Sequence, residues 1–148
     1  MKIRLSLLLF VTLLLAQTYQ SAAQVELVKD INPSAPAFEV NETLVVYSGK
    51  LLFPANDGTA GNELWVSDGT ETGTTLLKDI NPGVNNSFPR FLRVSGDRLY
   101  FNGFTDNEGF ELYYTDGTSG GTILNADLIP GSAGSSPANL YAAEHNLF

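Results

Sequence analysis

Short runs rich in apolar residues, separated by turn residues, cover most of the chain after residue 24. Four of them follow one another at Arg90–Val94, Arg98–Phe104, Phe110–Thr115 and Gly121–Leu128. Aromatic and β-branched residues dominate these runs, and large apolar side chains in the third alternate with a more polar set. This period of two, with short turns between the runs, predicts antiparallel β-strands. No stretch beyond the first 24 residues has helical periodicity, so we expect an all-β chain.

The same pattern returns with a period of about 48 residues. ELWVSDGTETGTT (Glu63–Thr75) returns as ELYYTDGTSGGTI (Glu111–Ile123), and VKDINPS (Val28–Ser34) returns as LKDINPG (Leu77–Gly83). Periods of roughly 40 to 50 residues are typical of propeller blades and solenoids, and four antiparallel strands make one blade of a β-propeller. We therefore expect propeller-type blades over residues 24–148, with repeats at about 28–76, 77–123 and 124–148, the last of them truncated.

The repeats do not suffice for a closed propeller. Roughly two and a half are present, whereas closure takes at least about four blades. The segment Val25–Pro33 matches the last strand of a repeat, and the third repeat stops at Asn146–Phe148, before any ELW strand. Unpaired blades would expose apolar faces and strand edges. We expect these to be covered by the remaining repeats of a longer chain or by self-association.

The first 23 residues read as a cleaved secretory signal peptide. Lys2 and Arg4 precede the apolar run Leu5–Ala16, and the small residues Ser21–Ala23 suit a signal peptidase. The run is shorter than the ~20 residues that a membrane span needs. We therefore expect a secreted or cell-surface protein, with no membrane insertion after cleavage.

The net charge and the composition of the chain limit the classes of binding partner that we expect. Loss of the two basic residues with the signal takes the formal net charge from −8 to −10. Such an acidic chain repels phosphate backbones and anionic membranes, so no nucleic-acid partner is expected. The chain has no cysteine, which excludes disulfides and a lipidated cysteine anchor.

The repeated Asp-Gly-Thr stretches lie between strand-like runs. Asp-Gly is a strong hairpin signal, because such turns need residues that tolerate positive φ, and Asp also bonds its own backbone two residues on. A feature that recurs from repeat to repeat serves the fold better than it serves a single active site. We assign a structural turn role to Asp68, Gly69, Gly73, Asp116, Gly117 and Gly121.

The segment ELWVSDGTETGTTLLKDINPG (Glu63–Gly83) resembles the signature of the ELWxxDGT repeat family, exported bacterial proteins that carry many such repeats. The second copy has Tyr113 where the first has Trp65, and the third lacks this segment. The resemblance covers essentially Val25–Phe148. It implies a propeller-like secreted or surface protein and brings no mechanism with it.

The sequence contains few residues or motifs typical of catalysis, and we expect no enzyme activity. His145 is the only histidine and lies in a polar stretch, and no phosphate loop or H-E-x-x-H motif is present. Glu63 and Glu111 resemble the acid/base pair of a glycosidase, but they occupy equivalent positions one repeat apart. Structural hydrogen bonding is therefore the favoured interpretation of both.

Calcium is the one cofactor that the sequence brings into consideration. Asp57, Asp106 and Glu108 lie in acidic, glycine-containing loops at matching places in two repeats, and Ca²⁺ prefers hard oxygen ligands. The spacing of an EF-hand loop is absent, and acidic turn loops are common. These residues are therefore weak calcium candidates.

Three functions remain open. The chain is a surface binding or adhesion module with a glycan or protein ligand, a structural spacer, or part of a propeller-type carbohydrate-active enzyme whose catalytic residues lie outside this chain. An aromatic-lined patch would favour glycan binding, a single acidic cluster the enzyme, and featureless loops the spacer.

Overall fold

The computed structural model describes residues 26–37, 43–143 and 146–147, and this part of the chain is all-β with no helix. The signal peptide expected at residues 1–23 lies outside it. The first sheet contains β1 (Val45–Tyr47), β2 (Lys50–Asn56), β3 (Asn62–Ser67) and β4 (Thr75–Lys78). The second contains β5 (Arg90–Ser95), β6 (Arg98–Thr105), β7 (Gly109–Thr115) and β8 (Ile123–Ala126).

Both sheets are four-stranded, antiparallel and ordered by sequence, from β1 to β4 and from β5 to β8. This confirms the predicted fold class. In the second repeat β5 to β7 match the expected strands to within one residue at each end, and β8 is two residues shorter at each end than the run Gly121–Leu128. Thr122 is taken into the preceding turn, where its hydroxyl bonds the Thr118 carbonyl. The sheets do not close into a ring.

Chain segments at both ends of the described region lie against these sheets. The segment 26–37 forms no strand. The Lys29 ammonium in this segment donates a hydrogen bond of 2.8 Å to the carbonyl of Thr74, the residue before β4. At the other end β9 (Ala142–Ala143) and β10 (Asn146–Leu147) form a separate two-stranded sheet. No helix in these described ranges is long and apolar enough to cross a membrane.

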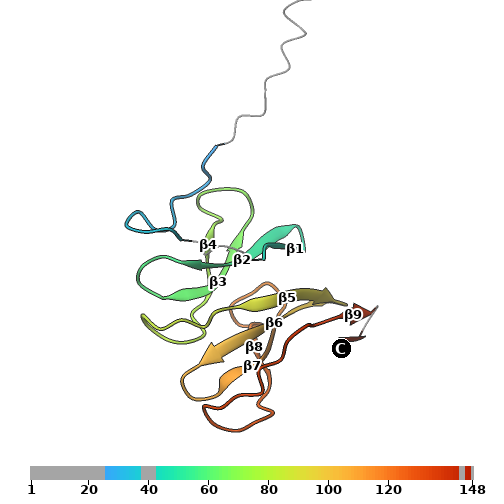
Figure 1. Cartoon of the computed structure of the whole chain (residues 1–148). Coiled ribbons are helices and arrows are strands. Elements are labelled where there is room, and N and C mark those ends of the chain that lie inside the picture. Colours follow the sequence, from blue (N-terminus) through green and yellow to red (C-terminus); the bar gives the residue numbers. More distant parts are fainter. Residues whose placement is uncertain (1–25, 38–42, 144–145, 148) are drawn as a thin grey trace, which may run out of the picture.

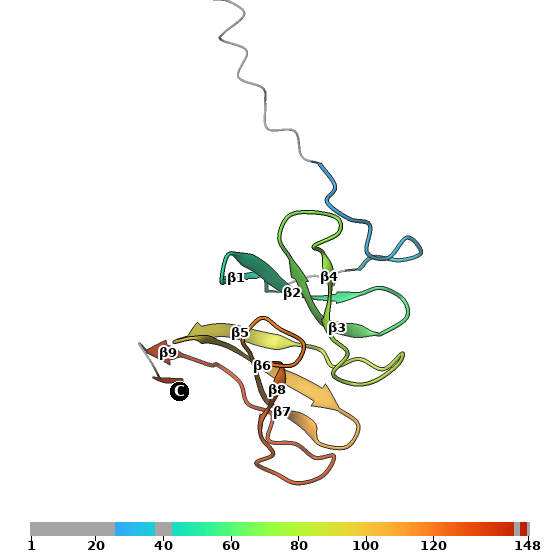
Figure 2. The ribbon, with the colours of Figure 1, turned by 180° about the vertical axis from the view of Figure 1, so that it is seen from behind.

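The main core lies between the two sheets, which Figures 1 and 2 show stacked one above the other. Leu52, Leu64 and Val66 of the first sheet belong to the same buried cluster as Leu99 and Phe101 of the second. A smaller cluster around Phe53 and Trp65 occupies the opposite face of the first sheet, where Ile31 packs against it.

Residues paired across neighbouring strands point to the same face of a sheet. The register of the second sheet therefore places one set of side chains on the face that is turned away from the first sheet. We call this the open face. The chain after β8 runs along this side (Figures 1 and 2). The open face comprises Arg90, Arg93, Ser95, Arg98, Tyr100, Asn102, Phe104, Phe110, Leu112, Tyr114, Ile123 and Ala126.

Candidate binding site

The structure places Asp68 and Asp116 in identical exposed turns. Asp68 Oδ1 accepts the Thr70 backbone N–H at 2.9 Å and the Thr70 hydroxyl at 2.7 Å. Asp116 accepts the same two bonds from Thr118 at the same distances. The bond from the threonine hydroxyl, followed by the bond from the threonine N–H, lowers the pKa of each aspartate below its ordinary value. Each carboxylate is thus engaged within its own turn.

The glycines of these turns are needed for two different reasons. Gly69 and Gly117 have φ of 89° and 87°, a region that side chains rarely adopt. Gly73 leaves room for the Asp68 carboxylate, because a Cβ there would lie 2.0 Å from Asp68 Oδ1 and displace it, and Gly121 stands in the same relation to Asp116.

The glutamate of each ELW segment is fully buried and binds the linker that follows its sheet. Glu63 Oε2 accepts from the Ile80 N–H at 2.9 Å and from the Ser87 hydroxyl at 2.6 Å. Glu111 accepts from the Ser135 N–H at 2.7 Å and also from the Ser135 hydroxyl. Both carboxylates therefore hold a linker against the start of their own strand.

Burial raises the pKa of Glu63 to about 7, against the opposing effect of the Ser87, Ile80 and Asn81 hydrogen bonds. The neighbouring charge of Asp79 adds to the rise. Glu63 and Glu111 belong to different sheets, each with its own serine and linker. The geometry does not join them as an acid/base pair.

The calcium candidates are not brought together around one point. Asp57 Oδ1 accepts from Thr59 and Ala60 in a local turn, and Asp106 Oδ2 accepts from the Asn85 amide at 3.0 Å. Glu108 Oε2 accepts from Thr105 and Tyr113 hydroxyls. Burial alone would raise the pKa of Asp57, but the hydrogen bonds from Ala60 and Thr59 lower this pKa below its ordinary value. No cluster of three His, Asp or Glu side chains suited to a metal occurs in the described ranges, and His145 lies outside them.

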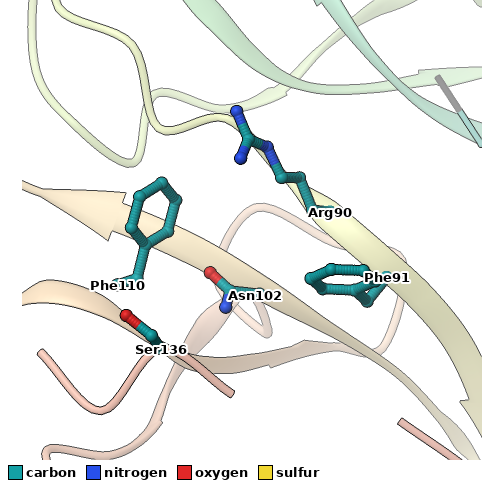
Figure 3. A pocket seen from close by; sticks show the side chains of 5 residues that line it. All are labelled: Arg90, Phe91, Asn102, Phe110 and Ser136. Carbon is teal, nitrogen blue, oxygen red and sulfur yellow. The ribbon is translucent and has the colours of Figure 1, made fainter. Parts of the chain in front are cut away.

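A pocket of about 250 Å³ opens on the second sheet, and sequence analysis did not anticipate it. Figure 3 shows its lining, which comes from β5, β6, β7 and the chain that follows β8. The size is slightly below that of pockets for drug-sized ligands, which suits a ligand of about one ring. Its lining residues are Arg90, Phe91, Asn102, Phe110 and Ser136.

A β-bulge aims Phe91 at this pocket. Arg90 pairs with Asn102 and Arg93 with Tyr100, so two residues of β5 lie opposite one residue of β6. Phe91 has a φ of 57°, rare for a bulky residue, and its side chain is 42% exposed. Bulges of this kind redirect a side chain out of the strand's alternation. One aromatic ring is thereby presented to solvent at the rim.

Asn102 supplies an unpaired acceptor. Its side chain is only 4% exposed, and its Nδ2 donates to the Pro137 carbonyl at 2.5 Å. Because a carbonyl can only accept, this bond fixes the amide orientation and leaves Oδ1 as the other atom. Oδ1 is buried and has no hydrogen-bond partner within the described ranges. A ligand that brings a donor would satisfy it.

The pocket residue Ser136 has an equivalent in the first repeat, Phe88. The Phe88 N–H donates to the Asn62 carbonyl, and at the equivalent place the Ser136 N–H donates to the Phe110 carbonyl. Phe88 and Ser136 also share a positive φ, 46° and 49°. The second repeat therefore carries a small side chain where the first carries a ring. Aligning the repeats would have revealed this difference, but not its consequence.

The positions of the open face carry cations and aromatic rings and no carboxylate. The Arg98 guanidinium lies 4.0 Å from the Tyr114 ring centroid, and that of Arg90 lies 5.3 and 5.5 Å from the Phe88 and Phe110 rings. All three arginines after the signal lie on this sheet. An otherwise acidic chain thus has one basic, aromatic face.

Comparison with known proteins adds no relative: no family model, no curated protein and no solved structure matches the chain.

We predict that Asp68→Asn keeps the fold and changes the melting temperature little, because the Asn side-chain oxygen accepts the same Thr70 bonds. Gly73→Ala serves as the contrasting variant and should destabilise by about 0.5–1.5 kcal/mol, because the added Cβ displaces the Asp68 carboxylate from its hydrogen bonds with Thr70. Thermal melts with and without calcium test this. A calcium-dependent rise in melting temperature that disappears in Asp68→Asn would contradict a purely structural role.

We predict that Glu63 makes the protein less stable as pH rises. A carboxyl group with a raised folded-state pKa stabilises the fold below its unfolded value of 4.5, and this contribution is lost as pH rises through about 7. The melting temperature should fall between pH 5 and pH 8, and less so in Glu63→Gln, which cannot ionise. Equal pH profiles for both proteins would rule out this titration.

Proposed function

We propose that the chain is an exported surface repeat protein that acts as a binding module and holds a saccharide in the open-face pocket. Export rests on the signal pattern of residues 1–23, and the repeat type on the ELWxxDGT resemblance of Glu63–Gly83. The observation that carries the binding role is the combination, in one pocket, of two phenylalanine rings with the unpaired oxygen of Asn102.

Saccharides match both features. A sugar ring offers apolar C–H faces to the rings of Phe91 and Phe110, and its hydroxyls are donors for Asn102 Oδ1. Ligand sites typically combine apolar walls with a few convergent polar groups in this way. A ligand without a donor would leave Oδ1 unpaired, at a cost of about 1–3 kcal/mol. Donor-bearing ligands are therefore favoured over purely apolar ones.

The pocket is shaped by tied backbone as well as by side chains. The wall at Ser136 is held by its N–H bond to the Phe110 carbonyl at 2.8 Å. Beside it, Pro137 is held by Asn102 and Ser135 by Glu111. A site held in this way loses little conformational entropy on binding.

We predict that Ser136→Phe abolishes saccharide binding and leaves the fold intact. The ring would fill the pocket, and the first repeat already carries Phe88 at the same backbone position and φ. Binding of the purified chain to an array of neutral and acidic oligosaccharides measures this, with circular dichroism to check folding. The exposed Val84→Ala is the control and should bind as the parent does.

Removal of one ring gives a second measure of the same site. Phe91→Ala should weaken whichever saccharide binds by about tenfold, the equivalent of about 1.4 kcal/mol. Saccharide binding that persists unchanged in both Ser136→Phe and Phe91→Ala would place the ligand elsewhere and refute the proposal.

A further inference from the structure

We infer that the saccharide held by the open-face pocket is an acidic one, with a carboxylate that pairs with Arg90. This inference rests on the proposed saccharide-binding function and names its ligand class. It follows from the state of Arg90, from the distribution of charge on the second sheet and from the donor that Asn102 requires.

Arg90 is positioned but not neutralised. Its guanidinium lies 5.3 Å from the Phe88 ring centroid and 5.5 Å from that of Phe110, at the pocket's edge. A cation–π contact of this kind positions a guanidinium without occupying its N–H donors in a hydrogen bond. Arg90 forms no ion pair or hydrogen bond with any residue in the described ranges. Its planar fork is suited to a carboxylate, which it binds through two parallel bonds.

No acidic residue is among those that line the pocket. Glu111 is buried against Ser135, and Asp116 and Asp106 are engaged in turns or with the neighbouring loop. None of them belongs to the open face, so an anion entering the pocket meets Arg90 without a competing carboxylate there. In a chain of net charge −8 this is a local reversal of sign.

Arg90 and Asn102 together define the chemical groups that the ligand must carry. In Figure 3 Arg90 lies above the Asn102 side chain, whose oxygen is turned toward the space beside Phe110 and whose nitrogen is turned away. A ligand must therefore offer an anion to Arg90 and a donor to Asn102, with an apolar face for the Phe91 ring. A hexuronic acid carries a carboxylate, ring hydroxyls and C–H faces on a single ring. A carboxylate alone would satisfy Arg90 and leave Asn102 Oδ1 unpaired.

The test compares D-glucuronate, its neutral methyl ester and D-glucose, titrated into the purified chain by calorimetry at low salt. Glucuronate should bind at least about tenfold more tightly than either neutral sugar. The preference should shrink as salt rises to 0.5 M. Arg90→Gln should remove it and retain weak binding of glucose, while Lys50→Gln, which changes the net charge equally on the first sheet, should preserve it.

Each other outcome has a distinct meaning. Equal affinity for glucuronate and glucose would overturn the acidic class and leave saccharide binding intact. A preference that survives Arg90→Gln would overturn the role of Arg90. Acetate or an aspartate-rich peptide binding as tightly as glucuronate would show that charge alone is read and would also overturn the inference. Failure of every sugar to bind would refute the proposed function itself.

Discussion

Much of this structure depends on a buried carboxylate that binds a serine. Glu63 holds Ser87 and Glu111 holds Ser135, in each case at the linker that leaves one sheet for the next. A fully buried carboxylate is costly unless donors surround it, and here the donors come from the linker itself. The linker therefore has one favourable path, and the next sheet starts from a fixed place. This explains why the ELW glutamate recurs with the repeat.

The same contact connects the fold to the open face. Ser135 is followed by Ser136 and Pro137, and these residues form the pocket wall opposite β6 and β7. In the first repeat the same path brings Phe88 to the equivalent position. The two repeats thus share a backbone path here and differ in side chain, with serine in place of phenylalanine at the pocket. Repeat proteins in general can vary function in this way, because the backbone is set by residues other than those that vary.

The sequence predicted the architecture well because its signals are local. Alternation located β5 to β7 within a residue or so, and Asp-Gly-Thr located the turns after β3 and β7. The pocket depends on contacts that no local pattern contains. Phe91 faces outward because of a bulge in the β5–β6 register, and Asn102 Oδ1 is left unpaired because Nδ2 binds Pro137, 35 residues away. The Asp-Gly-Thr turns form a repeated motif, whereas the pocket residues Phe91 and Ser136 belong to no motif.

We propose that the Glu111–Ser135 contact in the second repeat shapes the open-face pocket, whereas the Glu63–Ser87 contact in the first repeat contributes to stability alone. The direct measurement is the saccharide affinity of Ser135→Ala beside that of Ser87→Ala, with the melting temperature of each. Both variants should lose stability. Only Ser135→Ala should also lose affinity, by about threefold or more, since a hydrogen bond of this kind contributes about 0.5–1.5 kcal/mol. Equal affinities in the two variants would contradict the account.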